Sequence, residues 1–256
     1  MNVAIYGGTF DPVHNGHLAV ARAAAERYKL GRVYFVPADI PPHKQKQPLT
    51  PYYHRYAMLA LALAGEKNFV SSLLEAPEII QAERKLASYS IETVRRLRAR
   101  LGKRDKLFFV IGIDAFRDIA KWRSPVELLS ECEFIVASRP GFSLADVAMA
   151  LPEELRPARE IAELFADRDA AGTIAFGGAT IHLLDDVHST VSATQIRAAV
   201  RANRPLTKFV PAMVADYIRK HALYTSKQEP GSPNLPAPSA ERGLQIVSRT
   251  QPVHRK

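Results

Sequence analysis

The sequence predicts an α/β fold in which helices cover both faces of a doubly wound parallel sheet. Short runs of β-branched and aromatic residues alternate with longer stretches of helical periodicity through most of the 256 residues. Several of the short runs are apolar throughout, as in strands that are covered on both faces. This alternation favours strand–helix–strand crossovers, and therefore a parallel sheet. The composition agrees, because 47% hydrophobic and 24% charged residues suit a globular protein with an ordinary core.

The strands are expected where β-branched or aromatic residues form short runs. In chain order these runs are residues 2–6, 33–37, 69–73, 107–111, 134–138 and 180–184. In a sheet of this kind, ligands bind beyond the carboxyl ends of the strands. The loops that follow strands are therefore the places to search for a site.

The helices are expected between these strands. In chain order they are residues 16–28, 51–64, 90–101, 114–121, 125–130, 192–203 and 211–221. Ser124 followed by Pro125 predicts a helix start, with a capping residue and a proline at the first helical position. Ser192 with Gln195 three residues later matches a capping box and predicts another start.

Residues 1–225 are expected to form one domain, and residues 226–256 a disordered basic tail. The tail has five prolines and no Phe, Trp or Tyr, so it buries too little apolar surface to offset its ordering. Its five basic and two acidic residues carry +3 of the formal net charge of +9. The tail is interpreted either as a solvated extension or as an electrostatic arm for an anionic partner. Residues 142–178 form a long mixed segment, interpreted as a helical insertion with a helix at about 151–167.

The composition also excludes some classes of protein. The longest apolar run, residues 56–64, is far shorter than the roughly 20 residues of a membrane span. The first residues lack the basic region and apolar stretch of a signal peptide, and Cys132, the single cysteine, excludes intrachain disulfides. We therefore expect a cytoplasmic protein without membrane contact. The basic balance favours an anionic partner: a nucleotide, a nucleic acid or an acidic lipid.

The loop after the first strand carries the strongest signal for chemistry. Gly7 and Gly8 allow a tight turn and a close approach of the backbone to a ligand. The following helix points its free amides at the loop, which favours an anion. His14 and His17 are three apart, so both can face one ligand. Three interpretations stay open: a structural turn, a metal site that adds Asp11 to the histidines, and a phosphate site for a nucleoside triphosphate.

Residues 8–17, which read GTFDPVHNGH, resemble the signature of the nucleotidylyltransferase superfamily, with its H-x-G-H core. The resemblance implies a Rossmann-like fold and an enzyme that transfers AMP or CMP from a nucleoside triphosphate to a phosphate-bearing acceptor. It further implies that both histidines of the core contact the triphosphate and stabilise the transition state. By the same resemblance, Gly7, Gly8, Thr9 and Phe10 bind ATP.

A second anion site is predicted at residues 191–197, which read VSATQIR. Besides its capping box, this helix start bears Ser192, Thr194 and Arg197, a set that suits a phosphate at a helix N-terminus. The segment resembles the superfamily's second motif, S-x-T-x-I-R. That resemblance implies contact with the β- and γ-phosphates of ATP, whereas the alternative is a helix start and nothing more.

Further motifs resemble those of the bacterial nicotinate mononucleotide adenylyltransferases. They are PADIPPHK at residues 37–44, HRYAML at 54–59, SYSIET at 88–93, GID at 112–114, KW at 121–122 and RPG at 139–141. The resemblance implies transfer of AMP from ATP to nicotinate mononucleotide. The residues implied to bind that acceptor are Asp39, Lys44, Ser90, Asp114, Trp122 and Arg139. The chemistry agrees, because an indole stacks on a pyridine ring and a carboxylate seeks hydroxyl or arginine donors.

The mechanism that these residues permit is direct in-line attack of the acceptor phosphate on the α-phosphorus of ATP. A phosphate dianion is already a nucleophile near pH 7, so no general base is required. His14, His17, Lys44 and Arg197 are expected to stabilise the charge that develops. We expect Mg²⁺ to arrive with ATP and to bridge its phosphate oxygens rather than to occupy a protein metal site.

Two alternatives to this function stay open. A sister adenylyltransferase would use nicotinamide mononucleotide or phosphopantetheine as the acceptor. A protein of another class would bind nucleic acid or regulate a partner through the tail and the basic segment at residues 95–104, which lacks interleaved aromatics for base stacking. The sequence also leaves open whether the chain forms a homo-oligomer.

Overall fold

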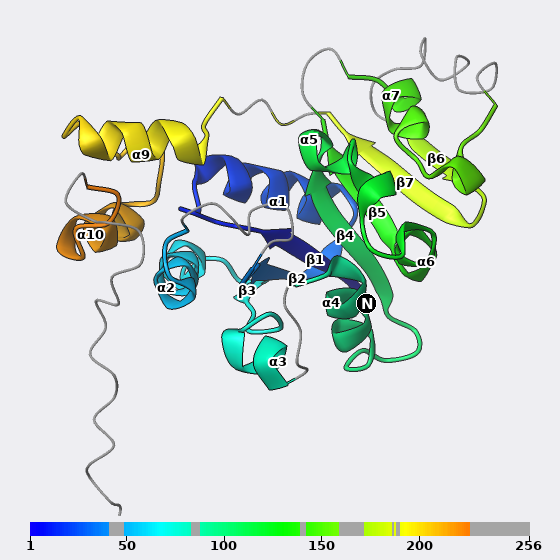
Figure 1. The fold of residues 1–256 in the computed structure, drawn as a ribbon, viewed down its shortest axis with the longest axis horizontal. Coiled ribbons are helices and arrows are strands. Elements are labelled where there is room, and N and C mark those ends of the chain that lie inside the picture. The colour runs from blue at the N-terminus through cyan, green and yellow to red at the C-terminus, as the bar shows by residue number, and fades with distance from the viewer. Residues whose placement is uncertain are drawn as a thin grey trace, which may run out of the picture.

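The computed structural model describes residues 1–40, 49–82, 88–138, 142–158, 172–185, 187 and 190–225. These residues build one sheet with helices on both faces (Figure 1). The strand order is β3-β2-β1-β4-β5-β7-β6. The strands are β1 (Asn2–Gly8), β2 (Leu30–Pro37), β3 (Phe69–Ser71), β4 (Lys106–Gly112), β5 (Glu133–Ala137), β6 (Thr173–Phe176) and β7 (Ala179–Leu184). All neighbouring strands are parallel except β6 and β7, which are antiparallel.

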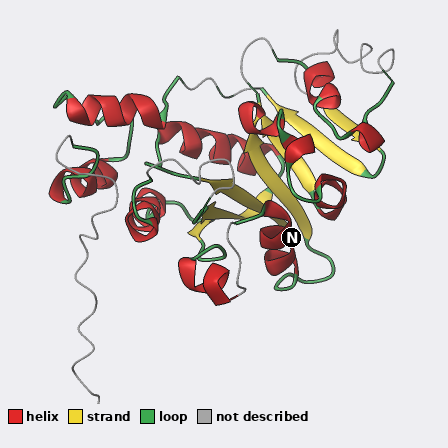
Figure 2. Cartoon of the chain, viewed as in Figure 1, coloured by secondary structure: helices red, strands yellow, loops and turns green. Residues whose placement is uncertain are grey.

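The helices fill the connections between strands (Figure 2). They are α1 (Asn15–Arg27), α2 (Tyr52–Leu63), α3 (Pro77–Ala82), α4 (Ser90–Arg98), α5 (Ile113–Phe116), α6 (Pro125–Glu131), α7 (Leu144–Met149), α9 (Ala193–Arg201) and α10 (Ala212–Lys220). Two short 3₁₀ turns, η2 (Ile119–Lys121) and η3 (Glu153–Leu155), complete the described elements. None of the helices in the described part of the chain is long and apolar enough to cross a membrane.

The alternation of side chains along β1 shows why both faces of the sheet are covered. Val3 and Ile5 belong to one buried cluster, which α4 and α6 complete. Ala4 and Tyr6 belong to a second cluster on the opposite face, with α1, α2, α9 and α10. Successive strand residues point to opposite faces, so an apolar strand demands a helix layer on each side. This confirms the predicted doubly wound, mainly parallel α/β fold.

The strand order places a switch point in the middle of the sheet. From β1 the chain passes outward to β2 and β3, and then returns to place β4 on the other side of β1. At such a point the loops beyond the carboxyl ends of the two central strands diverge and leave a crevice. The loop after β1 is therefore where the fold favours a ligand.

The region between β5 and α9 differs from the prediction. The helix expected at about residues 151–167 is wrong over its described part, which holds only η3. The α-helix lies earlier, because Ser143 and Asp146 form a capping box that starts α7. The missed strand β6 pairs with β7 across a turn in which Gly177 and Gly178 have φ of +60° and +88°, a conformation that favours glycine.

Two further predictions need correction in detail. The helix expected at residues 114–121 is broken into α5 and η2. Ser124 does not cap α6 through its side chain, because its backbone is left-handed at φ 47° and its hydroxyl makes no capping hydrogen bond. Pro125 does open α6, as predicted. The predicted tail, residues 226–256, lies outside the described residues.

Candidate active site at the carboxyl ends of β1 and β4

The loop after β1 is tightly packed at the carboxyl edge of the sheet. Phe10 is 2% exposed and has a φ of 47°, so the chain turns sharply there. A Cβ atom on Gly8 would lie 3.1 Å from the Phe10 ring, which is closer than ordinary packing allows. A larger residue at this position would therefore force the Phe10 ring to shift. The loop leads directly into α1, whose N-cap residue is His14.

His14 and His17 lie side by side at the start of α1. Their ring centroids are 3.7 Å apart with planes inclined by 24°. The His14 backbone N–H donates to Nδ1 of His17 over 3.2 Å. Because Nδ1 of His17 accepts this bond, the proton of the neutral ring belongs on Nε2, which leaves Nε2–H as a donor. The prediction that both rings share one location is confirmed.

Burial keeps both imidazoles uncharged near neutral pH. Burial lowers the pKa of His14 from 6.5 to about 4. Burial, and then repulsion from His14, lowers the pKa of His17 well below 6.5. Nδ1 of His14 is itself buried and has no hydrogen-bond partner among the described residues. Two neutral, adjacent rings with an unused ring nitrogen are suited to a ligand that supplies oxygen atoms and negative charge.

The second predicted phosphate element meets the first. Ser192 and Gln195 form the predicted capping box of α9, with bonds of 3.0 and 3.3 Å. Arg197 donates from Nη1 to the carbonyl oxygen of Asp11 over 2.7 Å and from Nη2 to Thr194 Oγ1 over 3.3 Å. The loop after β1 and the first turns of α9 are therefore in direct contact. A guanidinium held by a carbonyl and a hydroxyl keeps its charge for an anion.

The structure gives the metal interpretation of Asp11 no support. One carboxylate oxygen accepts from the Tyr224 hydroxyl over 2.7 Å, and the other accepts from the Thr50 backbone N–H over 3.2 Å. Asp11 thus fixes the loop instead of pointing at a ligand. Within the described ranges, no group of three or more His, Cys, Asp or Glu residues is arranged to hold a metal ion.

The four described residues that are expected to bind the acceptor, Asp39, Ser90, Asp114 and Trp122, lie in segments that follow β2, β3 and β4. Ser88 N–H donates to the Ile40 carbonyl over 3.2 Å, which brings the start of α4, and with it Ser90, beside the loop that holds Asp39. The Arg123 guanidinium lies 4.8 Å from the ring centroid of Tyr89, the residue before Ser90. The segments around residues 39, 90 and 122 are therefore neighbours.

Individual acceptor residues differ in exposure. Trp122 is partly buried and meets Phe109 edge-on, with centroids 6.3 Å apart, so it serves the core as well as the edge. Asp114 is exposed in the first turn of α5. Burial raises the pKa of Asp39, against the opposing effect of Arg55. Lys44 and Arg139 lie outside the described residues.

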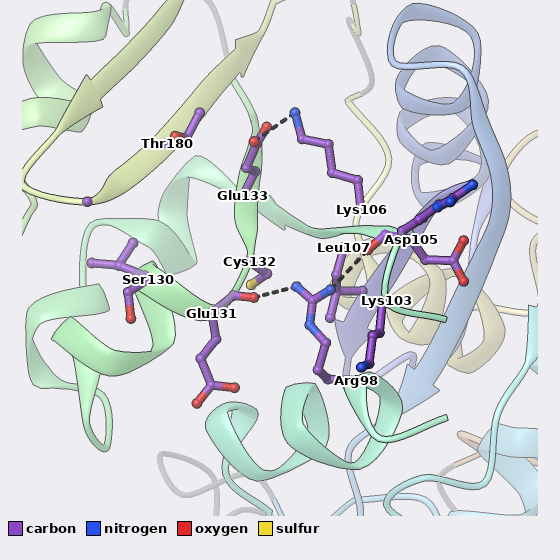
Figure 3. Close-up of a pocket in the computed structure, with 13 residues that line it drawn as sticks. Arg98, Lys103, Asp105, Lys106, Leu107, Ser130, Glu131, Cys132, Glu133 and Thr180 are labelled. Atoms are coloured by element: carbon purple, nitrogen blue, oxygen red, sulfur yellow. Dashed lines mark hydrogen bonds and ion pairs between the residues drawn. The ribbon is translucent and has the colours of Figure 1, made fainter. Parts of the chain in front are cut away.

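A cavity of about 390 Å³ lies at the opposite, amino edge of the sheet (Figure 3). Several of its polar groups are bound to neighbouring groups. Lys106 pairs with Glu133 over 2.7 Å, and Arg98 donates to the carbonyls of Asp105 and Glu131 over 3.1 and 2.7 Å. The predicted site residues lie elsewhere, so this cavity is not the site that the sequence indicates.

Arg55 is a buried residue beside the candidate site that the sequence did not single out. Its guanidinium is 1% exposed and donates to four backbone carbonyls around the site, those of Thr9, Ala38, Asp39 and Thr50. The motif at residues 54–59 contains it, but no sequence pattern shows that its partners are backbone oxygens from separate loops.

The fold and the paired phosphate elements define a nucleotidyltransferase. The cytidylyltransferase-like family matches residues 5–199, and the chain belongs to this family.

Its relatives include proteins named "Probable nicotinate-nucleotide adenylyltransferase". The one from Moorella thermoacetica is 37% identical over 222 residues, covering 87% of this chain and 91% of that protein. The one from Thermoanaerobacter is 34% identical over 231 residues, covering 90% and 98%. The resemblance inferred from the motifs is thereby confirmed.

Solved structures agree on the fold. The Plasmodium falciparum nicotinic acid mononucleotide adenylyltransferase complexed with NaAD matches with a TM-score of 0.60 at 18% identity, covering 87% of this chain and 97% of that chain. At this identity the match is one of fold.

Proposed function

We propose that this protein transfers AMP from ATP to nicotinate mononucleotide, giving deamido-NAD and pyrophosphate. The observation that carries the proposal is the bond from Arg197 to the Asp11 carbonyl, because it joins the two phosphate-binding motifs into one site. The relatives named above support the choice of acceptor.

In the proposed reaction the acceptor's 5′-phosphate oxygen forms a bond to the α-phosphorus of ATP. The bond from that phosphorus to the oxygen that bridges it to the β-phosphate breaks, and pyrophosphate leaves with its electron pair. The residues supply position and charge, because the attacking dianion needs no base. Arg197 faces the leaving phosphates, and Ser192 and Thr194 at the start of α9 add hydroxyl donors.

His14 and His17 act as neutral hydrogen-bond donors to the triphosphate. As the polyanion binds, its negative charge raises the pKa of both imidazoles, so a positive charge becomes easier to hold where negative charge develops. Starting from neutral rings avoids the repulsion between two adjacent cations in the free enzyme. Gly7, Gly8, Thr9 and Phe10 shape the backbone cradle of this loop.

Mg²⁺ is proposed to bind together with ATP. The donor set fits this role, because nitrogen and backbone donors dominate the described site and no carboxylate cluster is present among the described residues. When bound to the triphosphate, the ion neutralises phosphate charge. Lys44 is proposed to add a cation beside the same phosphates.

The acceptor side is proposed to use Ser90, Trp122 and Arg139 around the nicotinate ring and its carboxylate, and Asp114 on the nucleotide. Asp39 lies in the loop after β2 on this side, where burial raises the pKa of its carboxyl group against the opposing effect of Arg55.

The test supplies ATP and Mg²⁺ with nicotinate mononucleotide, nicotinamide mononucleotide or phosphopantetheine in turn, and measures pyrophosphate. We expect release with nicotinate mononucleotide and much less with the others, with a reaction lacking acceptor as the control. Release only with another acceptor would transfer the assignment to a sister enzyme.

The structure weakens the case for nucleic-acid binding through the basic segment at residues 95–104. Arg95 is paired with Glu127 and Glu131, and Arg98 is bound to backbone carbonyls, so these arginines serve the fold. A salt-sensitive affinity for DNA or RNA that vanishes when residues 226–256 are deleted would restore this alternative.

A further inference from the structure

Arg55, on α2, is a buried cation that is bound by backbone carbonyl oxygens. Nη1 donates to Thr9 over 2.8 Å and to Ala38 over 2.7 Å. Nε donates to Thr50 over 2.8 Å, and Nη2 to Asp39 over 3.3 Å. Burying a guanidinium is costly, and its planar fork of donors is the feature that lets it reach four acceptors at once.

These four acceptors come from both halves of the proposed site. Thr9 belongs to the loop after β1, which is proposed to hold ATP. Ala38 and Asp39 belong to the loop after β2, on the acceptor side. The backbone adds one direct tie, from the Ala38 N–H to the Gly8 carbonyl over 2.9 Å. Because β1 and β2 are already paired up to Gly8 and Pro37, the guanidinium ties the two loops together just beyond the end of this ladder.

Asp11 extends the same framework to the second phosphate element. Its carboxylate is held by the Tyr224 hydroxyl and the Thr50 N–H, and its carbonyl accepts from Arg197. Thr50 is shared, since its carbonyl accepts from Arg55. An unbroken chain of hydrogen bonds thus runs from the acceptor loop through Arg55 and Asp11 to Arg197.

We infer that Arg55 and Asp11 are positioning residues that fix the distance between the two bound substrates. The inference rests on the proposed function, since it names what the framework positions. In-line transfer needs the attacking oxygen close to the α-phosphorus, and a displacement of about 1 Å costs about 100-fold in rate. Neither residue needs to touch a substrate for this effect.

The first test is Arg55→Lys, which keeps the charge but removes the fork. We expect kcat to fall about 100-fold while KM for ATP and for nicotinate mononucleotide each stay within about threefold, because each substrate still finds its own loop. The matched control is Arg98→Lys, since Arg98 also holds two backbone carbonyls but lies at the amino edge of the sheet. The control should keep the wild-type kcat and KM. Wild-type turnover in folded Arg55→Lys would overturn the inference.

A milder variant covers the case in which Arg55→Lys does not fold. Tyr224→Phe removes only the hydroxyl that binds Asp11, and we expect kcat to fall about tenfold, again with little change in either KM. An unchanged kcat would show that Asp11 does not position the site.

Amide hydrogen exchange separates this inference from the proposed function, because it needs no turnover. In Arg55→Lys, the amide of Ala38 should exchange faster, while the amides of the β4 and β5 core keep their protection. If the wild-type protein releases no pyrophosphate, the proposed function fails, and the exchange result still decides whether Arg55 couples the loops. Unchanged protection at Ala38 would overturn the coupling.

Discussion

Both edges of the sheet hold charged side chains, but these side chains have different partners. At the amino edge, charges are paired with opposite charges: Lys106 binds Glu133 over 2.7 Å, and His182 binds the same carboxylate over 2.7 Å. At the carboxyl edge, Arg55 and Arg197 are held mainly by backbone carbonyls. The histidines beside them are neutral.

The difference shows which charges are available to a ligand. A phosphate that binds Lys106 at the amino edge would compete with the Glu133 carboxylate. A phosphate at the carboxyl edge meets a guanidinium whose charge no carboxylate cancels among the described contacts of Arg197. The pI of about 9.7 therefore says less about binding than the pairing of each charge does.

The strongest test of this difference between the edges is to replace one histidine at each edge and compare turnover. His17→Ala should lower kcat by about 100-fold to 1000-fold, because one preorganised donor to the developing charge is worth about 3–4 kcal/mol. The measurement is steady-state kinetics, with circular dichroism to confirm folding. The matched variant His182→Ala should keep the wild-type kcat, and near-normal turnover in His17→Ala would remove that ring from the mechanism.

As the pH is lowered, the two edges should lose their contributions to stability over different pH ranges. The pKa of His14 falls from 6.5 in the unfolded chain to about 4 in the folded chain. Between those values the unfolded chain binds a proton that the folded chain does not, so stability falls as the pH falls. From pH 7 to 5 this site alone should cost about 2 kcal/mol.

The amino edge responds at lower pH. Burial acts against the ionised form of Glu133, but its bonds to Lys106 and His182 outweigh burial and lower its pKa. Its stabilising contribution is therefore lost only as the pH falls below the ordinary glutamate value of 4.5.

Urea unfolding at pH 7 and 5 should show that His14→Gln loses about 2 kcal/mol less than the wild type. Equal losses would contradict the buried, neutral state of His14.

The smallest effect is expected from the amino-edge ion pair. Glu133→Gln should lower the free energy of unfolding by about 1 kcal/mol or less, because partly exposed pairs contribute little. Turnover should be unchanged. A fall in kcat would show that the amino edge takes part in function after all, and would erase the contrast between the edges.

Local patterns in the sequence predicted those parts of the molecule that depend on local rules. The short run of β-branched and aromatic residues at the start of the chain predicted β1, and the spacing of Ser192 and Gln195 predicted the start of α9. The adjacency of His14 and His17 followed from helical spacing in the same way.

What escaped prediction depends on partners far along the chain or on weak local signals. Residues 173–176 are mostly exposed and become a strand only through pairing with β7. The Ser143–Asp146 capping box is a local signal for a helix start, but the prediction placed a longer helix further along the chain. The sequence carries no signal for the burial of Arg55, because its acceptors are backbone carbonyls that any residue would supply.

The span of the bond between Arg197 and Asp11 has a consequence for how the enzyme comes into being. The two residues are 186 positions apart. The second edge of β1 also stays unpaired until β4 has been made. Contacts between such distant positions form late, since the intervening chain must first be closed into a loop. A chain still being synthesised therefore carries the histidine motif long before the arginine that completes it. The contact between the loop after β1 and α9 can therefore form only after both segments have been made.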